Sequence, residues 1–269
     1  MTVRDWDKAY DNSGAFPEVD AYFAQRQAMA IEFKATANTS ADCPYGPGER
    51  HRFDLFRPEH KARGLFFYVH GGYWKALDKN AFSHVAQGAV KRGFTAVLPS
   101  YTLCPQARIS EITAEIVMAL EAAARKVNGP IYVAGHSAGG HLVSRLLCKD
   151  VKLSDDVSAR LRRVVSISGV QDLRPLLKTQ MNEVLGLSPE DARSESPILC
   201  DPVEGSSLMC WVGADELYEF RRQNAALYEV WRGFDMTVSK HEAIGKNHFT
   251  VIDDLCDPDS WLMSSLLAP

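Results

Sequence analysis

Short hydrophobic runs alternate along this chain with longer segments of mixed polarity. Residues 52–56 carry apolar side chains at alternate positions, which predicts a strand with one face exposed. Five other runs are almost continuously apolar, as in strands buried on both faces. These runs are residues 64–69, 94–98, 131–134, 164–167 and 208–212.

Helical patterns lie between these runs. The clearest covers residues 109–127, where apolar residues recur on one face, and Asn128-Gly129-Pro130 follows as a stop signal. Strands that alternate with helices predict an α/β fold, with a mostly parallel sheet flanked by helices. Binding and catalytic groups are then expected just after the strands, at their carboxyl ends.

The strand pattern stops between about residues 172 and 202. This stretch contains Pro175, Pro189, Pro197 and Pro202, separated by short amphipathic pieces. We interpret it as an insertion of short helices that forms a small cap. Nothing in its composition indicates a linker, so residues 1–269 are expected to form one domain.

A nucleophile candidate follows the run at residues 131–134. Gly135-His136-Ser137-Ala138-Gly139 fits the pattern G-x-S-x-G between a predicted strand and a predicted helix. Such a turn needs small residues beside the serine, and it places the hydroxyl at a helix N-terminus. The alternative is a glycine-rich turn that contains a serine by chance.

A second glycine-rich loop, His70-Gly71-Gly72-Tyr73-Trp74, follows the run at residues 64–69. Loops of this kind supply backbone N–H donors to a developing oxyanion. We expect donors from Gly72 and Tyr73, together with the N–H of Ala138. The alternative is a tight turn that only ends the strand.

An acid and a base are expected after the serine, in that order. Asp215 follows the strand at residues 208–212 and is the preferred acid, with Glu216 as its adjacent rival. His248 is the preferred base because it lies in a loop, whereas His241 falls in or beside a predicted strand. Together Ser137, His248 and Asp215 would form a triad that works through an acyl-enzyme.

Composition narrows the range of partners. The net charge of −4 without a basic stripe argues against nucleic acid, and no apolar run is long enough to span a membrane. The N-terminus lacks the apolar segment of an export signal, and the six scattered cysteines are interpreted as free thiols. A cytoplasmic location is therefore expected. No zinc motif occurs, and the chemistry requires neither a metal nor an organic cofactor. The sequence leaves the oligomeric state open, a homodimer included.

The two glycine-rich motifs resemble those of one known enzyme family. The loop His70–Trp74 matches H-G-G-x-W of the α/β-hydrolase kynurenine formamidases, also called arylformamidases, and residues 135–142 resemble that family's nucleophile segment. Similarity continues from about Tyr45 to the C-terminus. Its further pieces are residues 168–175, residues 190–193 with Ser196-Pro197, residues 213–216, residues 219–223 and His248-Phe249.

The resemblance implies an α/β-hydrolase fold and hydrolysis of N-formyl-L-kynurenine to L-kynurenine and formate, with Ser137, Asp215 and His248 at the triad positions. The expected partner is a small acyl substrate, an aryl formamide or an ester. Tyr73 and Trp74 are candidates to stack on its ring. Trp6 and Tyr10 are weaker candidates, for which simple packing is the better interpretation.

The same residues allow other interpretations of the binding site and of the function. Arg174, Arg221 and Arg222 could bind the substrate carboxylate or could be surface charges. A carboxylesterase for small acyl or aryl esters would use the same residues. A hydrolase fold kept as a binding module is the third reading, although such proteins usually lack a triad member.

Overall fold

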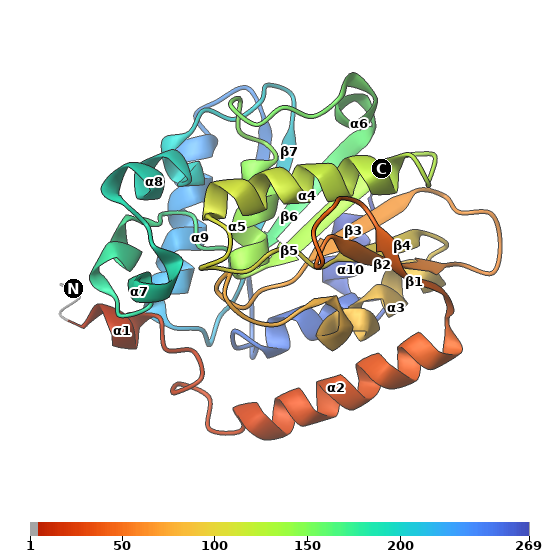
Figure 1. The fold of residues 1–269 in the computed structure, drawn as a ribbon, viewed down its shortest axis with the longest axis horizontal. Helices are drawn as coiled ribbons and strands as arrows, with labels where there is room; N and C mark the ends of the chain where they lie inside the picture. The colour runs from red at the N-terminus through yellow and green to blue at the C-terminus, as the bar shows by residue number, and fades with distance from the viewer. Residues whose placement is uncertain (1–4, 269) are drawn as a thin grey trace.

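An eight-stranded sheet runs through the middle of the protein (Figure 1), a computed structural model in which residues 5–268 are described. The spatial order of its strands is β1-β2-β4-β3-β5-β6-β7-β8. β2 runs antiparallel to both of its neighbours, and the other pairs are parallel. The strands are β1 (Asn38–Pro44), β2 (Arg52–Arg57), β3 (Leu65–Val69), β4 (Thr95–Pro99), β5 (Ile131–His136), β6 (Leu161–Ile167), β7 (Ser207–Gly213) and β8 (Thr237–Ala243). The predicted α/β-hydrolase fold with a mostly parallel sheet is therefore confirmed.

Helices and 3₁₀ turns connect the strands. The helices are α1 (Trp6–Ala9), α2 (Val19–Thr36), α3 (Gln87–Lys91), α4 (Ile109–Ala124), α5 (Ala138–Arg145), α6 (Asp155–Arg160), α7 (Asn182–Leu185), α8 (Pro189–Ser194), α9 (Tyr218–Trp231) and α10 (Trp261–Leu266). The 3₁₀ turns are η1 (Lys79–Ala86), η2 (Arg174–Lys178), η3 (Pro197–Leu199) and η4 (Thr250–Leu255). None of the described helices has the length and apolar character needed to cross a lipid bilayer.

The sheet separates two hydrophobic cores. In β3, Leu65, Phe67 and Val69 face one core, and Phe66 and Tyr68 face the other, as the two-residue repeat of a strand requires. The first core also contains side chains of α4, α5, α9 and the cap, and the second contains side chains of η1, α3, η4 and α10. The near-continuous apolar runs are thus explained, because both faces of the central strands are buried.

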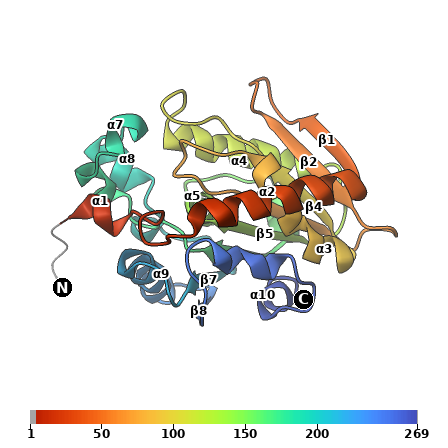
Figure 2. The same ribbon diagram turned by 90° about the horizontal axis from the view of Figure 1, so that it is seen from below.

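Two N-terminal helices lie outside these layers. α2 runs along one side of the molecule, where it packs on η1 (Figure 1). α1 lies at one end beside the short helices of the cap, as the view in Figure 2 also shows. The short helices expected between about residues 172 and 202 are present as η2, α7, α8 and η3.

The expectation of an exposed face on β2 was wrong. Phe53 to Phe56 are all buried, including the carboxylate of Asp54. This carboxylate lies 2.9 Å from the ammonium of Lys79, which is itself buried, and 2.6 Å from that of Lys34. An acidic residue in an alternating pattern therefore marked a buried ion pair here and not a solvent-facing position.

This ion pair generates a stability prediction. Lys79→Met should lower the free energy of unfolding by about 3 kcal/mol, because it removes the buried partner of a buried carboxylate. The matched control is Lys240→Met, which removes an exposed partner of Glu229 and should cost less than about 1 kcal/mol. Urea unfolding followed by circular dichroism measures both values, and equal losses in the two variants would contradict the prediction.

Candidate active site

Ser137 lies in the sharp turn between β5 and α5. Its backbone has φ 55° and ψ −115°, and its N–H donates to the carbonyl of Ile167 at the end of β6 over 2.8 Å. Gly139 is required by close packing, since a Cβ there would lie 2.1 Å from the carbonyl oxygen of Val69. The strained conformation is the one expected of a nucleophile elbow. It leaves Ser137 only 3% exposed, on the wall of a large cavity.

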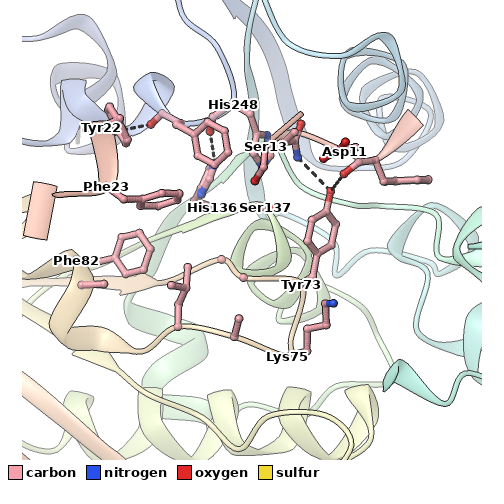
Figure 3. Close-up of a pocket in the computed structure, with 18 of the residues that line it drawn as sticks. Asp11, Ser13, Tyr22, Phe23, Tyr73, Lys75, Phe82, His136, Ser137 and His248 are labelled. Carbon is pink, nitrogen blue, oxygen red and sulfur yellow. Dashed lines mark hydrogen bonds between the residues drawn. The ribbon is translucent and has the colours of Figure 1, made fainter. Parts of the chain in front are cut away.

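His248 also lines this cavity, in the loop after β8 (Figure 3). Its Nδ1 lies 2.7 Å from a carboxylate oxygen of Glu216. Its backbone carbonyl lies 2.8 Å from Nε2 of His136. Because a carbonyl can only accept a hydrogen bond, Nε2 of His136 carries the proton and donates it. Burial holds the pKa of His136 well below its ordinary value, so this second imidazole is neutral.

The acid beside His248 is Glu216, and the preference for Asp215 was wrong. The carboxylate of Glu216 turns back into the protein, where it accepts hydrogen bonds from the Gly213 N–H at 2.7 Å and from the Ser168 hydroxyl at 2.5 Å. Asp215 is exposed, and within residues 5–268 only its backbone N–H forms a hydrogen bond, to the carbonyl of Lys246. The turn after β7 thus directs the first acidic side chain to solvent and the second one inward.

Ser168 is a residue that the sequence analysis did not assign to the site. It follows β6 with a positive φ of 52°, and its N–H donates to the carbonyl of Trp211 over 2.7 Å. This conformation is costly for a residue other than glycine, and it aims the hydroxyl at Glu216. The sequence signals were its place directly after a buried strand and its position at the start of residues 168–175, a segment that resembles the kynurenine formamidases.

The glycine-rich loop after β3 lies against the nucleophile turn. A Cβ on Gly71 would come within 3.1 Å of the Cβ of Ser137. Gly72, Tyr73 and Trp74 all have positive φ, at 109°, 49° and 55°, and the Gly72 carbonyl accepts from the N–H groups of Lys75 and Ala76. The first part of this loop is therefore fixed next to Ser137, where oxyanion donors are needed.

The two aromatic residues of the loop have different surroundings. Tyr73 lines the cavity (Figure 3), and its role as a substrate contact stays a prediction. Trp74 does not line it, and its prediction as a substrate contact was wrong. The indole is completely buried, edge-on to the His141 ring at 5.1 Å between centroids. It supports the loop from behind.

The N-terminal segment closes one wall of the cavity. The Tyr73 hydroxyl donates to the carbonyl of Tyr10 over 2.6 Å and accepts from the amide nitrogen of Asn12 over 3.1 Å. The Tyr10 hydroxyl is buried and donates to Glu219 over 3.0 Å, and its ring contacts Phe220, which in turn lies 4.4 Å from the His248 ring. The N-terminal segment is thus bound to both the loop and the helix that border the site.

The cavity is large and mixed in character, with a volume of about 1200 Å³. Phe23, Phe82 and Phe249 line it, as does the exposed Lys75. Its wall comes from five parts of the chain. These are residues 5–31, residues 71–84, the nucleophile turn, residues 180–184 of the cap and the segment around His248.

The arginines considered for substrate binding lie elsewhere. Each has a carboxylate partner: Arg174 pairs with Asp172, Arg221 with Glu242 and Arg222 with Glu219. None of the three lines the cavity. Trp6 likewise packs outside it, with the ammonium of Lys178 over its ring at 5.5 Å.

Among the described residues, one group of side chains has the spacing of metal ligands: Cys148, Asp150 and Cys200. None of them lines the cavity. The arrangement at the cavity itself is a buried acid, an imidazole and a serine at a helix N-terminus, which are the parts of a serine hydrolase.

Comparison with known proteins agrees with this geometry. A family model described as the α/β hydrolase fold matches residues 66–250. The kynurenine formamidase of Danio rerio is 29% identical over 87% of this chain and 82% of its own length, and that of Salmo salar is 29% identical over 87% and 83%. Kynurenine formamidase of Drosophila melanogaster is also 29% identical, over 80% and 76%.

Solved structures show the same fold. A protein from Silicibacter sp. TM1040 that carries the provisional name thioesterase superimposes with a TM-score of 0.94 and 43% identity, over 98% of this chain and 99% of that one. An esterase of Pyrobaculum calidifontis gives a TM-score of 0.68 at 17% identity, over 88% and 85%, which shows the fold alone.

The family match covers β3 to the loop of His248 and leaves the N-terminal wall of the cavity outside it. The chain is a hydrolase that belongs to the α/β-hydrolase fold family, and its resemblance to the kynurenine formamidases is confirmed over most of its length.

Proposed function

We propose that this hydrolase cleaves the amide bond of an aryl formamide, N-formyl-L-kynurenine, and releases L-kynurenine and formate. The observation that carries the proposal is the 2.7 Å contact between His248 and the buried carboxylate of Glu216, in a cavity that Ser137 lines. The names of the curated relatives support the substrate.

In the first half-reaction, Glu216 accepts the Nδ1–H of His248 and leaves Nε2 as the base. Nε2 takes the hydroxyl proton of Ser137 while the serine oxygen attacks the formyl carbon. The backbone N–H groups of Gly72, Tyr73 and Ala138 are the proposed donors to the oxyanion, each worth about 3–4 kcal/mol in the transition state. The protonated His248 then gives its proton to the aniline nitrogen, which leaves as the amine.

In the second half-reaction, water attacks the formyl ester on Ser137. His248 again accepts a proton, this time from the water, and returns it to the serine oxygen when the ester bond breaks. Formate leaves and the free serine is regenerated. These steps need no group beyond the residues named and water.

The walls of the cavity suit an aromatic amino acid. A formyl group is the smallest acyl group, so it fits between the glycine-rich loop and the nucleophile turn. Phe23, Phe82 and Phe249 offer apolar surface to an aryl ring. Lys75 has no ion-pair partner within residues 5–268, and its ammonium is available to a substrate carboxylate.

The assignment of Glu216 as the acid can be tested against its neighbour Asp215 as a matched control. Glu216→Gln should lower kcat by about 10⁴-fold, because the amide no longer fixes the tautomer of His248 or stabilises its charged form. Asp215→Asn, one residue away and exposed, should leave kcat within about twofold of the original. Steady-state kinetics measures both. A large loss in Asp215→Asn with an active Glu216→Gln would overturn the assignment.

The substrate is tested by comparing kcat/KM for N-formyl-L-kynurenine, p-nitrophenyl acetate and a short aryl thioester. The thioester is included because the Silicibacter protein carries the provisional name thioesterase. We expect the formamide value to exceed both others by at least about tenfold, a difference of roughly 1.4 kcal/mol in transition-state binding. Ser137→Ala should abolish all three activities. A higher value for an ester or the thioester would refute the formamidase assignment but not the serine mechanism.

A third test asks whether the N-terminal wall of the cavity contributes to substrate binding. Tyr73→Phe removes the hydroxyl that binds Tyr10 and Asn12, so KM for the formamide should rise about 3- to 10-fold, as the loss of hydrogen bonds worth about 1 kcal/mol predicts. KM for p-nitrophenyl acetate should change less, because a small ester needs less of the wall. Tyr45→Phe is the control, since its hydroxyl donates to the Ser100 carbonyl away from the cavity. Equal effects on both substrates would argue against this role.

A further inference from the structure

Two cysteines meet outside the active-site cavity, where the cap joins the sheet. Cys148 follows α5, and Cys200 follows η3 at the end of the cap. Their sulfur atoms and a carboxylate oxygen of Asp150 all lie within 4.8 Å of one another. The two backbone segments are paired as well, since Cys148 forms an isolated antiparallel bridge with Pro202 and the Val203 N–H donates to the Leu147 carbonyl over 2.7 Å. The approach of the two thiols is therefore set by backbone hydrogen bonds.

A buried arginine lies among the same atoms. One terminal nitrogen of Arg145 is 3.1 Å from the sulfur of Cys200 and 3.1 Å from Asp150, and its Nε donates to Glu195 over 3.2 Å. A guanidinium carries a permanent positive charge, so this cluster already holds a cation. That charge opposes a divalent metal ion at this place, although two sulfurs and a carboxylate would otherwise suit one.

The two thiols have different surroundings. The pKa of Cys200 is lowered, first by the hydrogen bond from the Cys148 thiol and then by the charge of Arg145, against burial and the charges of Asp150 and Glu195. The pKa of Cys148 is raised, first by its hydrogen bond to Cys200 and then by burial. Cys200 is partly exposed, whereas Cys148 is completely buried. A partly exposed cysteine beside a cation, with a second thiol within 4.8 Å, is the arrangement of an oxidisable pair.

We propose that Cys200 and Cys148 form a peroxide-oxidisable dithiol, in which Cys200 reacts first and Cys148 resolves it to a disulfide. The inference is independent of the substrate proposed above, because neither residue lines the cavity.

The chemistry balances with hydrogen peroxide as the oxidant. The Cys200 thiolate attacks one peroxide oxygen, the O–O bond breaks, and the departing hydroxide takes a proton and leaves as water. The Cys148 sulfur then attacks the sulfur of the resulting sulfenic acid. The S–S bond forms, the S–O bond breaks, and the proton of Cys148 leaves with the hydroxide as a second water. Two thiols lose two electrons and one peroxide gains them.

The test uses the full-length reduced protein, treated with hydrogen peroxide and then alkylated under denaturing conditions. We expect two of the six thiols to be lost and a Cys148–Cys200 cross-linked peptide to appear by mass spectrometry, with both changes reversed by dithiothreitol. The melting temperature should rise on oxidation, because the bond constrains the unfolded chain. Oxidation of Cys200 to sulfinic acid without a cross-link, or an unreactive Cys200, would overturn the proposal in the wild-type protein itself.

Single variants separate the two roles. Cys148→Ser should stop at a sulfenic acid on Cys200 that dimedone traps, and Cys200→Ser should lose the reaction. The matched control is Cys210→Ser, which removes a fully buried thiol whose pKa burial raises to about 12 and should leave the cross-link unchanged. Dimedone labelling of Cys148 in place of Cys200 would reverse the assigned order and refute the proposal.

Discussion

The strained turn at Ser137 is the constraint on which the site depends. Its positive φ is held by the hydrogen bond to the Ile167 carbonyl, so the ends of β5 and β6 are joined through this serine. The packing around it leaves no room for a Cβ at Gly139, and it brings the loop of Gly71 against the serine. Carboxyl ends of parallel strands meet at one edge of a sheet, and the turn places the Ser137 side chain at that edge, on the wall of the cavity.

Motifs whose conformation is determined by neighbouring residues could be predicted from the sequence. The elbow at Ser137 and the glycine-rich loop of Gly71 and Gly72 have local causes, because small residues, flanking strands and positive φ all lie within a few positions. The central strands were predictable for the same reason, since residues buried on both faces leave an unbroken apolar run. β2 was misjudged because its alternating pattern contains an aspartate whose partners, Lys34 and Lys79, come from distant segments.

The acid and the aromatic contacts of the site could not be predicted from local sequence patterns. Asp215 and Glu216 are adjacent, and only the three-dimensional course of the turn decides which side chain points toward His248. Tyr73 and Trp74 are also adjacent, with similar positive φ, yet one side chain meets the N-terminal segment and the other meets His141 in the core. Neighbouring residues of similar chemistry are separated by contacts with distant parts of the chain, which no local pattern records. Asn12 was not predicted to line the cavity for the same reason, and Tyr10 was considered only as a weaker candidate to stack on the substrate ring.

The two histidines beside the serine explain how charge is directed in the proposed mechanism. The rings of His136 and His248 lie 4.7 Å apart, so two positive charges there would repel each other strongly in a buried site. Burial keeps His136 neutral, and its Nε2–H is used to hold the backbone of His248. His248 alone has a carboxylate on its Nδ1, and that carboxylate is already oriented by the Gly213 N–H and the Ser168 hydroxyl. In the proposed mechanism the proton taken from Ser137 therefore has one favourable destination, and the neutral imidazole of His136 positions His248 without competing for the proton.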